Sequence, residues 1–392
     1  MAGDERVQAD PGPTLTALNG VCEPGFGAVA DALARNFSER GEIGAAVSVF
    51  SEGRKVVDLW AGHRDLTRTI AWQSDTLCIV YSVTKSMCAL ALHMLADRGL
   101  VDLDVPVAAY WPEFAVKGKE RIRVRDSVSH HDGMCFVDSA RPGDIFDPEA
   151  MLTALVDQEP PWPPATKGAY NSATFGYMVG EIVRRVDGRR VDTFLREEVA
   201  DPLGAEFMIG VGVDDLPRLA DIHPNDDNAM FNAGNTPGTS LSRAWRPMPE
   251  RYGVKDLNSL DMRTGYLPSF GGHGTARGLA RIYAALAQGG TVGGVRLLSP
   301  EAVKRASAQQ WEEEADGTLG RPFRMAMGFM LNKPGYTPMG RNPAAFGHLG
   351  SGGALAFADP DTGISFAALT NYQCEGVGVG ERTESLVESL YA

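Results

Sequence analysis

The sequence predicts an α/β protein of the α+β type, with an antiparallel sheet built from both chain ends, flanking helices and an inserted helical domain. Two observations predict this architecture. Short β-prone apolar runs around glycine turns occur near both termini, whereas the middle of the chain reads as helices and long loops. The 392 residues, 44% of them hydrophobic, are enough for two domains with substantial cores.

The expected domain boundaries follow these runs. We expect residues 1–20 to be a flexible N-terminal lead-in, and residues 21–80 and 271–392 to form the α/β domain with its central antiparallel sheet. Residues 81–270 then form the helical domain, with long loops that line a cleft. Residues 223–270 are rich in Asn, Pro and Gly, and a loop of this length in a compact domain is usually functional or disordered.

The elements of the α/β domain are predicted from local patterns. Two pairs of β-prone runs flank the turns Ser51-Glu52-Gly53-Arg54 and Asp359-Pro360-Asp361-Thr362-Gly363, which is typical of hairpins. In chain order we expect a helix over about 25–38, strands at 45–50 and 55–60, strands at 353–358 and 364–369, and a closing helix over about 381–391.

The helices of the middle are predicted from apolar periodicity. The clearest covers residues 172–186, and Gly188 is its expected end. Its apolar residues fall at i, i+3, i+4, i+7, i+8 and i+11: Phe175, Met178, Val179, Ile182, Val183 and Val186. A second helix is expected over 276–288, and a third begins at Ser299 with a proline in its first turn.

Composition narrows the classes of partner and location. The net charge of −13 opposes binding to nucleic acid and to anionic membranes. No apolar run reaches the ~18 residues of a membrane span, and the polar, acidic N-terminus is unlike a signal peptide, so we expect a cytoplasmic protein. The five scattered cysteines predict free thiols, with neither disulfides nor a zinc site. The sequence leaves a monomer and a homodimer both open.

A serine and a lysine three residues apart occur in VYSVTKSM, residues 80–87. On a helix, Ser82 and Lys85 share a face. A serine hydroxyl needs a base to become a nucleophile, and burial makes lysine such a base by lowering its pKa. If Ser82 opens the helix, its free N–H can face a developing oxyanion. The alternative is that Ser82 caps a core helix and Lys85 extends to solvent.

Tyr170 and the segment around His348 supply further polar groups. Tyr170 lies just before the 172–186 helix, where it can reach a cleft and relay protons, with its phenolate favoured by a nearby lysine. The glycine-rich segment 346–353 is expected to be an edge strand whose N–H groups lie along a substrate, with His348 at the mouth. The alternatives are a half-buried tyrosine bonded to backbone and a glycine-rich bend with an incidental histidine.

In this order the residues resemble the serine β-lactamase and penicillin-binding-protein superfamily, which carries S-x-x-K, a tyrosine motif, and a K-T-G or H-x-G strand. The chain is similar in particular to family VIII carboxylesterases, which resemble class C β-lactamases. The resemblance runs from about residue 25 to the end and implies a β-lactamase-like fold. Further similar segments are residues 125–134, 169–185, 201–204, 274–281 and 346–360.

The resemblance implies a role for each matching residue. Ser82 would be the acylated nucleophile, Lys85 its base, and Tyr170 the proton relay to the leaving group. The N–H groups of Ser82 and Ser351 would form the oxyanion hole. His348 would replace the lysine of K-T-G, and the strand residues His348, Leu349 and Gly350 would bind substrate.

Two departures from the family pattern bear on the substrate. Class C β-lactamases carry Y-x-N, whereas here Ser172 stands two residues after Tyr170 and Asn171 only one. K-T-G is absent as well. Both departures favour a neutral ester, so we expect a serine carboxylesterase of small to medium acyl esters, without metal or organic cofactor. Acyl transfer from the same acyl-enzyme, amide or β-lactam hydrolysis, and a non-catalytic binding protein are the alternatives.

Two other groups of residues are candidates for the functional site. His130, His131 and Asp132 invite a metal-site interpretation, but adjacent histidines point in different directions and no further ligand follows at zinc spacing. We expect a structural turn there. Some aromatic residues of the long loops are expected to wall an apolar acyl site: Trp162, Phe231, Trp245, Tyr266 and Phe270.

Overall fold

The computed structural model describes residues 17–392 except 226 and 377. Of the expected lead-in, residues 1–16 therefore lie outside the described residues. Its last two residues, Asn19 and Gly20, belong to the first strand, β1, which pairs with β3. For these two residues the prediction of a flexible lead-in was wrong. The sequence did not reveal the strand, because an exposed edge strand of four residues has too few apolar residues to form a pattern.

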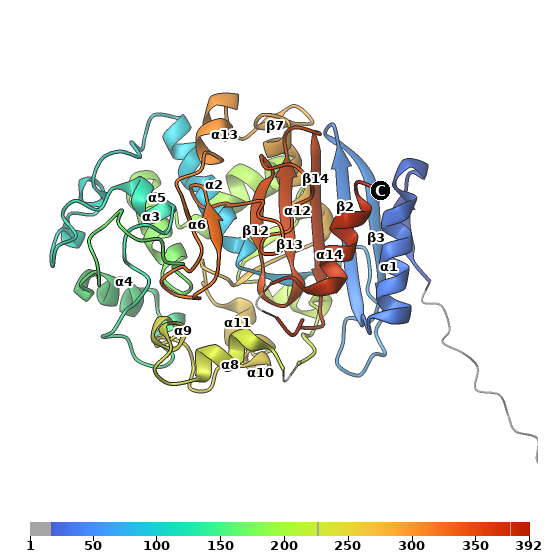
Figure 1. Ribbon diagram of the computed structural model, residues 1–392, viewed down its shortest axis with the longest axis horizontal. Coiled ribbons are helices and arrows are strands. Elements are labelled where there is room, and N and C mark those ends of the chain that lie inside the picture. Colours follow the sequence, from blue (N-terminus) through green and yellow to red (C-terminus); the bar gives the residue numbers. More distant parts are fainter. Residues whose placement is uncertain (1–16, 226, 377) are drawn as a thin grey trace, which may run out of the picture.

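Within the described residues, the largest sheet has nine antiparallel strands in the order β1-β3-β2-β14-β13-β12-β11-β10-β9. The pairing of β14 with β2, with Thr370 opposite Ala45, joins the two ends of the chain; Figure 1 shows these blue and red strands side by side. The predicted fold class is confirmed. The strands are β1 (Asn19–Cys22), β2 (Gly44–Ser51), β3 (Arg54–Gly62), β9 (Trp311–Glu313), β10 (Phe323–Met325), β11 (Met330–Leu331), β12 (Phe346–Leu349), β13 (Leu355–Asp359) and β14 (Ile364–Thr370).

Helices cover both faces of this sheet. On one face α1 (Gly27–Glu39) packs beside α14 (Gly380–Ser389), as Figure 1 shows, and their apolar residues share a core with β2, β13 and β14. On the other face α12 (Ala276–Ala287) packs on β14 and β2. A larger core lies on that side and continues into the helices of the middle of the chain. Burial of apolar area on both faces is the main stabilising contribution to such a layered fold.

The middle of the chain is helical, as expected. The helix predicted over 172–186 is found as Phe175–Asp187, and Gly188 ends it with a φ of 89°. This helix is α5. The other α-helices of the described chain outside residues 223–270, besides α1, α12 and α14, are α2 (Val83–Asp97), α3 (Val124–Val128), α4 (Pro148–Asp157), α6 (Val191–Leu195), α7 (Asp201–Leu203) and α13 (Pro300–Ala306). In the described part of the chain, no helix is both long enough and apolar enough to cross a membrane.

A small sheet connects the middle of the chain to its C-terminal part. Its order is β4 (Cys78–Tyr81), β6 (Gly272–Gly274) and β5 (Phe207–Ile209); the other short pair is β7 (Thr291–Val292) with β8 (Val295–Arg296). Gly272 allows the close packing, because a Cβ there would lie 2.6 Å from Thr84 Oγ1. Strand β5 lies within residues 81–270 and pairs with β6, which lies beyond residue 270, so the expected boundary between the two domains passes through a sheet. The division into these two domains stays a prediction.

The expectation of a long structureless loop at 223–270 was wrong. The segment contains four short helices: α8 (Ala229–Asn235), α9 (Ser240–Ala244), α10 (Val254–Leu257) and α11 (Leu260–Thr264). Side chains of Asn228, Thr239 and Ser259 cap three of them. Helices of one or two turns are too short to show apolar periodicity, which explains why the sequence did not reveal them.

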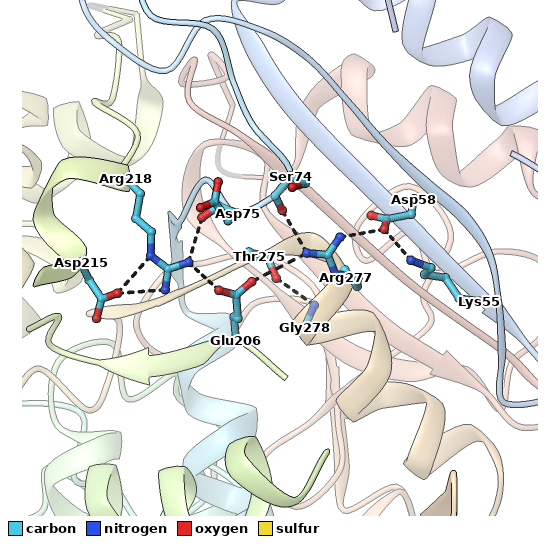
Figure 2. Close-up of polar contacts among 10 residues, drawn as sticks. All are labelled: Lys55, Asp58, Ser74, Asp75, Glu206, Asp215, Arg218, Thr275, Arg277 and Gly278. Atoms are coloured by element: carbon cyan, nitrogen blue, oxygen red, sulfur yellow. Dashed lines mark hydrogen bonds and ion pairs between the residues drawn. The ribbon is translucent and has the colours of Figure 1, made fainter. Parts of the chain in front are cut away.

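A chain of ion pairs holds the sheet against the small sheet and its neighbours. Figure 2 shows Arg277 of α12 between Asp58 of β3, at 2.8 Å, and Glu206, at 3.8 Å. The same Glu206 accepts from Arg218, which also binds Asp215. The network therefore links a strand of the large sheet to residues of the middle segment.

Candidate active site

Ser82 lies at the junction between a strand and a helix. Strand β4 ends at Tyr81, which has a φ of 48°, and α2 begins at Val83. Positive φ is uncommon for a non-glycine residue and marks a tight turn. Helix α2 is buried on all sides over Val83 to Leu95, so the core fixes its N-terminus. Ser82 is partly exposed, and its hydroxyl makes no capping bond to the helix.

Lys85 is fully buried, with its amine beside the serine hydroxyl. Its Nζ lies 3.3 Å from Ser82 Oγ and donates to the carbonyls of Ser172, at 2.9 Å, and Ser269, at 2.8 Å. Among the described residues no carboxylate pairs with it. Burial therefore lowers the pKa of Lys85 to about 7. A neutral amine has two N–H donors for the two carbonyls, which leaves its lone pair for the proton of Ser82.

The Ser269 carbonyl is positioned by close packing of α5 on residues 268–269. The hydroxyl of Ser269 accepts from the N–H of Gly176, at 2.8 Å, and donates to the carbonyl of Ala173, at 2.6 Å. A Cβ on Gly176 would lie 2.1 Å from the carbonyl carbon of Pro268. Glycine is therefore required at this crossing, and it sets where the Ser269 carbonyl meets Lys85.

The Tyr170 ring is buried beside both residues. It stacks on Phe323, with centroids 5.6 Å apart, and on His130, at 4.9 Å; Lys85 Nζ lies 4.9 Å from its centroid. Burial raises the pKa of the Tyr170 phenol well above its usual value, although a hydrogen bond with Ser82 opposes this. The direction of this shift opposes the phenolate expected from the sequence and favours a neutral phenol, because a lysine with a pKa near 7 does not offset the desolvation of the anion. The role of Tyr170 as the proton relay stays a prediction.

Ser351 lines the site together with the nucleophile. It opens the short 3-10 helix η7 (Ser351–Gly353) directly after β12, and it lines the same two pockets as Ser82. In the described part of the chain, the backbone N–H groups of Ser82 and Ser351 donate to no other protein group. That leaves both available to a ligand, as an oxyanion hole requires; the assignment itself stays a prediction.

The strand that carries His348 is placed differently from its expected position. β12 pairs with β13 on one side and with β11 on the other, so the expectation of an edge strand was wrong. Leu349 and Gly350, beyond the last β11 pair, line a pocket with Ser82. His348 is fully buried behind Tyr170, with centroids 6.0 Å apart, and its Nδ1 lies 2.6 Å from the Leu349 carbonyl oxygen. Burial lowers the pKa of His348 to about 3. Its role in substrate binding stays a prediction.

An apolar pocket opens on one side of Ser82. Its empty volume is about 420 Å³, open solvent at the mouth included. Of the five aromatic residues that the sequence offered as candidates for an acyl pocket, three line this one. Trp162 and Tyr266 do not line it. Trp245 also donates from its Nε1 to the Ser172 hydroxyl, at 3.0 Å. The lining residues are Tyr81, Ser82, Ser172, Ala173, Met230, Phe231, Trp245, Met248, Tyr252, Phe270 and Ser351.

A second pocket opens on the other side of Ser82, beside Tyr170. Its empty volume is about 360 Å³, again with open solvent included. Arg321 in this wall was missed from the sequence, because a lone arginine in a loop gives no signal of its own. The lining residues are Ser82, Tyr170, Met230, Leu319, Arg321, Phe323, Met330, Leu349, Gly350 and Ser351.

His130 was also missed as a neighbour of the site. The expected turn is present, since His130 has a φ of 59°, but the turn places the ring between Tyr170 and Phe175. Its Nδ1 accepts the N–H of Asn171, at 2.9 Å. The Asn171 amide donates to buried Asp132, at 3.0 Å, and so points away from the pockets. Among the described residues no group of three or more His, Cys, Asp or Glu is arranged to hold a metal.

Comparisons with known proteins define the class of the molecule. Residues 30–388 match the family model described as Beta-lactamase, and the chain belongs to this family. It is 33% identical over 366 residues to Esterase/beta-lactamase LipL of Mycobacterium tuberculosis, covering 90% of this chain and 82% of the relative.

Two solved structures are similar over almost the whole chain. A penicillin-binding protein homolog from Caulobacter crescentus is 35% identical, with a TM-score of 0.87 and coverage of 96% of this chain and 99% of that one. A family VIII carboxylesterase is 34% identical, with the same TM-score and coverage. The resemblance inferred from the sequence is confirmed, and the chain is a β-lactamase-like serine hydrolase with esterase relatives.

Proposed function

We propose that the protein is a carboxylesterase that cleaves small to medium acyl esters through an acyl-Ser82 intermediate. The observation that carries this proposal is the buried Lys85 amine, with a pKa near 7, at 3.3 Å from Ser82 Oγ. A lysine of this kind is a general base at neutral pH. Two similar proteins, an esterase/beta-lactamase and a family VIII carboxylesterase, support the same class.

The proposed reaction has two halves. Lys85 takes the Ser82 proton while Oγ bonds to the acyl carbon, and the oxyanion faces the N–H groups of Ser82 and Ser351. The ester C–O bond then breaks, and the leaving alkoxide takes a proton from the Tyr170 hydroxyl, which Lys85 replenishes. In the second half, water bonds to the acyl-Ser82 carbon and gives a proton to the Lys85 amine. The Ser82 Oγ–acyl carbon bond then breaks, Oγ takes that proton, and the acid and free Ser82 are released.

Two features of the pockets favour an ester over a β-lactam. Ser172 occupies the place where Y-x-N enzymes have an asparagine, and the Asn171 amide is bound to Asp132 instead. The side-chain amide that would hold an acylamino group is thus missing from the site. The pocket walled by Phe231 and Trp245 has no charged lining residue among those described, which suits an alkyl or aryl acyl group.

Hydrolysis of p-nitrophenyl acetate and butyrate tests the proposal. We expect turnover by the wild type and a loss of at least about a thousandfold in Ser82→Ala. The matched control is Ser86→Ala on the same helix, because the Ser86 hydroxyl bonds to Tyr283 and not to the site; it should retain activity. Full activity in Ser82→Ala would contradict the proposal.

Acyl transfer is the second candidate, because two pockets meet at Ser82 and one can hold an acceptor while the other holds the acyl group. A strong rate gain on adding an alcohol or amine, with acylated product, would favour transfer over hydrolysis. Nitrocefin turnover well above ester turnover would identify a β-lactamase instead.

A further inference from the structure

The pocket beside Tyr170 contains an arginine whose guanidinium forms no ion pair with any described carboxylate. Arg321 is the one charged side chain among the described residues that line the two pockets at Ser82. It is partly buried in the loop before β10, and its guanidinium lies 5.9 Å from the Phe323 ring centre. Its Nη2 makes one long bond, 3.4 Å, to the Tyr336 carbonyl. No ion pair of Arg321 is found within the described ranges 17–225, 227–376 and 378–392.

Asp316 is the carboxylate that acts electrostatically on Arg321, but backbone N–H groups already occupy its oxygens. Asp316 accepts N–H bonds from Tyr170, at 2.9 Å, from Thr318, at 3.0 Å, and from Leu319, at 2.9 Å. Its carboxylate does not come within ion-pair distance of the Arg321 guanidinium. A guanidinium has five N–H donors, and a partly desolvated one without a counter-ion is unfavourable unless a ligand supplies an anion.

The position of Tyr170 determines which half of the substrate meets this arginine. Tyr170 lines the Arg321 pocket and does not line the aromatic pocket. Since Tyr170 is the proposed proton donor to the leaving group, the alcohol half of an ester occupies the Arg321 pocket. The acyl half then occupies the apolar pocket, which has no charged lining residue among those described.

We propose that Arg321 binds a carboxylate on the alcohol half of the substrate, so that the preferred substrates are apolar acyl esters of hydroxy carboxylates and not the neutral esters expected from the sequence. This inference rests on the proposed esterase function and deepens it. The step is an acyl transfer: the Ser82 Oγ–acyl carbon bond forms, the ester C–O bond breaks, and the released hydroxy carboxylate takes its proton from Tyr170. Because the chain carries a net charge of −13, the preference for an anion is local to Arg321.

A matched pair of esters tests the inference. 4-(Butyryloxy)benzoate and 4-(butyryloxy)benzamide share the acyl group and differ in the charge of the leaving phenol. We expect the wild-type ratio of kcat/KM, corrected for the hydroxide-catalysed rates of the two esters, to favour the carboxylate by roughly tenfold or more. The ratio should fall as salt is added, because the binding is electrostatic.

Variants assign the preference to a residue. Arg321→Gln should bring the ratio close to one, and Arg321→Lys should give an intermediate ratio, because a lysine keeps the charge and loses the planar fork. The control is Arg324→Gln in β10, which removes the same charge from a residue bonded to Gln309 and outside the pockets; its ratio should match the wild type. 4-Hydroxybenzoate should inhibit the wild type better than 4-hydroxybenzamide.

The possible results distinguish a failure of the Arg321 inference from a failure of the proposed esterase function. Hydrolysis of both esters with a wild-type ratio near one, or a preference that survives in Arg321→Gln, overturns the role of Arg321 and leaves the esterase intact. Hydrolysis of neither ester, with no acylation of Ser82, overturns the proposed function and this inference with it. Melting temperatures of the variants show whether a lost preference reflects a lost fold.

Discussion

Lys85 illustrates how burial converts an ordinary side chain into a base. Its three hydrogen-bond partners are the Ser82 hydroxyl and two carbonyls, none of which carries a charge. Two buried histidines nearby, His130 and His348, have pKa values lowered by burial and by the proximity of Lys85, so they too are neutral. An uncharged surrounding of this kind favours the free amine over the ammonium ion.

The pH dependence of the rate should reflect Lys85. Only the neutral amine accepts the Ser82 proton, so kcat/KM for p-nitrophenyl acetate should rise about tenfold per pH unit below pH 7 and level off above it. The control is Lys119→Met, since Lys119 is equally buried, with its pKa lowered to about 8, but bonds to the Val156 and Gln158 carbonyls. A rise in kcat/KM that is centred near pH 10, or a midpoint that shifts in Lys119→Met, would contradict the assignment of this pH dependence to Lys85.

Tyr170 should matter for proton transfer. Removing its hydroxyl in Tyr170→Phe leaves the stacked ring in place, so we expect kcat to fall by about a hundredfold or more with little change in melting temperature. The comparison is Tyr283→Phe, whose buried hydroxyl bonds to Ser86 away from the pockets. An unchanged kcat in Tyr170→Phe, measured with p-nitrophenyl butyrate, would remove Tyr170 from the mechanism.

At the scale of elements, the crossing of α5 over residues 268–269 positions the base. In Gly176→Ala the new methyl group would meet the Pro268 backbone at 2.1 Å, so α5 or the 268–269 backbone must move. We expect a loss of about 1–3 kcal/mol in the free energy of unfolding, measured by urea denaturation. We also expect a shift in the pH profile, because the Ser269 carbonyl moves relative to Lys85.

A control for this prediction lies on α1. A Cβ on Gly27 meets no atom within 4 Å, and the residue has helical φ and ψ. Gly27→Ala should therefore be neutral or stabilise the protein by up to about 1 kcal/mol. If Gly176→Ala behaves like Gly27→Ala, the close packing of α5 does not position the site.

The elements also show what the sequence could reveal. Apolar patterns predicted both hairpins and the helix ending at Gly188, because these elements are long enough for a period to appear. Strand β4 was not predicted, because its apolar run continues directly into the buried helix α2, so that no boundary between the two elements is visible in the sequence. Ser82, Lys85 and Tyr170 were found through motif order, whereas Arg321 and His130 reach the site only through tertiary packing. Such residues cannot be predicted from a local sequence pattern, because the segments that bring them to the site are far apart in the chain.

At the scale of the whole molecule, the ion pairs of Figure 2 should add a modest amount of stability. Arg277 is about one-third exposed and bridges Asp58 and Glu206. We expect Arg277→Met to lower the free energy of unfolding by about 1–2 kcal/mol, less at high salt, without changing kcat/KM. The exposed pair of Arg54 with Glu23 serves as the comparison: Arg54→Met should have a smaller effect, because solvent screens this pair.

That network has a consequence for coupling between parts of the chain. Because Arg277 and Arg218 share Glu206, the stability effects of Arg277→Met and Arg218→Met should not add, as a double-mutant cycle would show. Additive effects would mean that the two arginines act independently and that Glu206 does not connect the large sheet to the middle segment.

The most direct test of the account is the intact mass of the protein during turnover of p-nitrophenyl butyrate, followed by peptide mapping. We predict a mass gain equal to one butyryl group, located on Ser82, absent from Ser82→Ala and retained in Ser86→Ala. Hydrolysis without any mass gain under rapid acid quench, or a butyryl group on the Ser82→Ala protein, would contradict the assignment of Ser82 as the nucleophile.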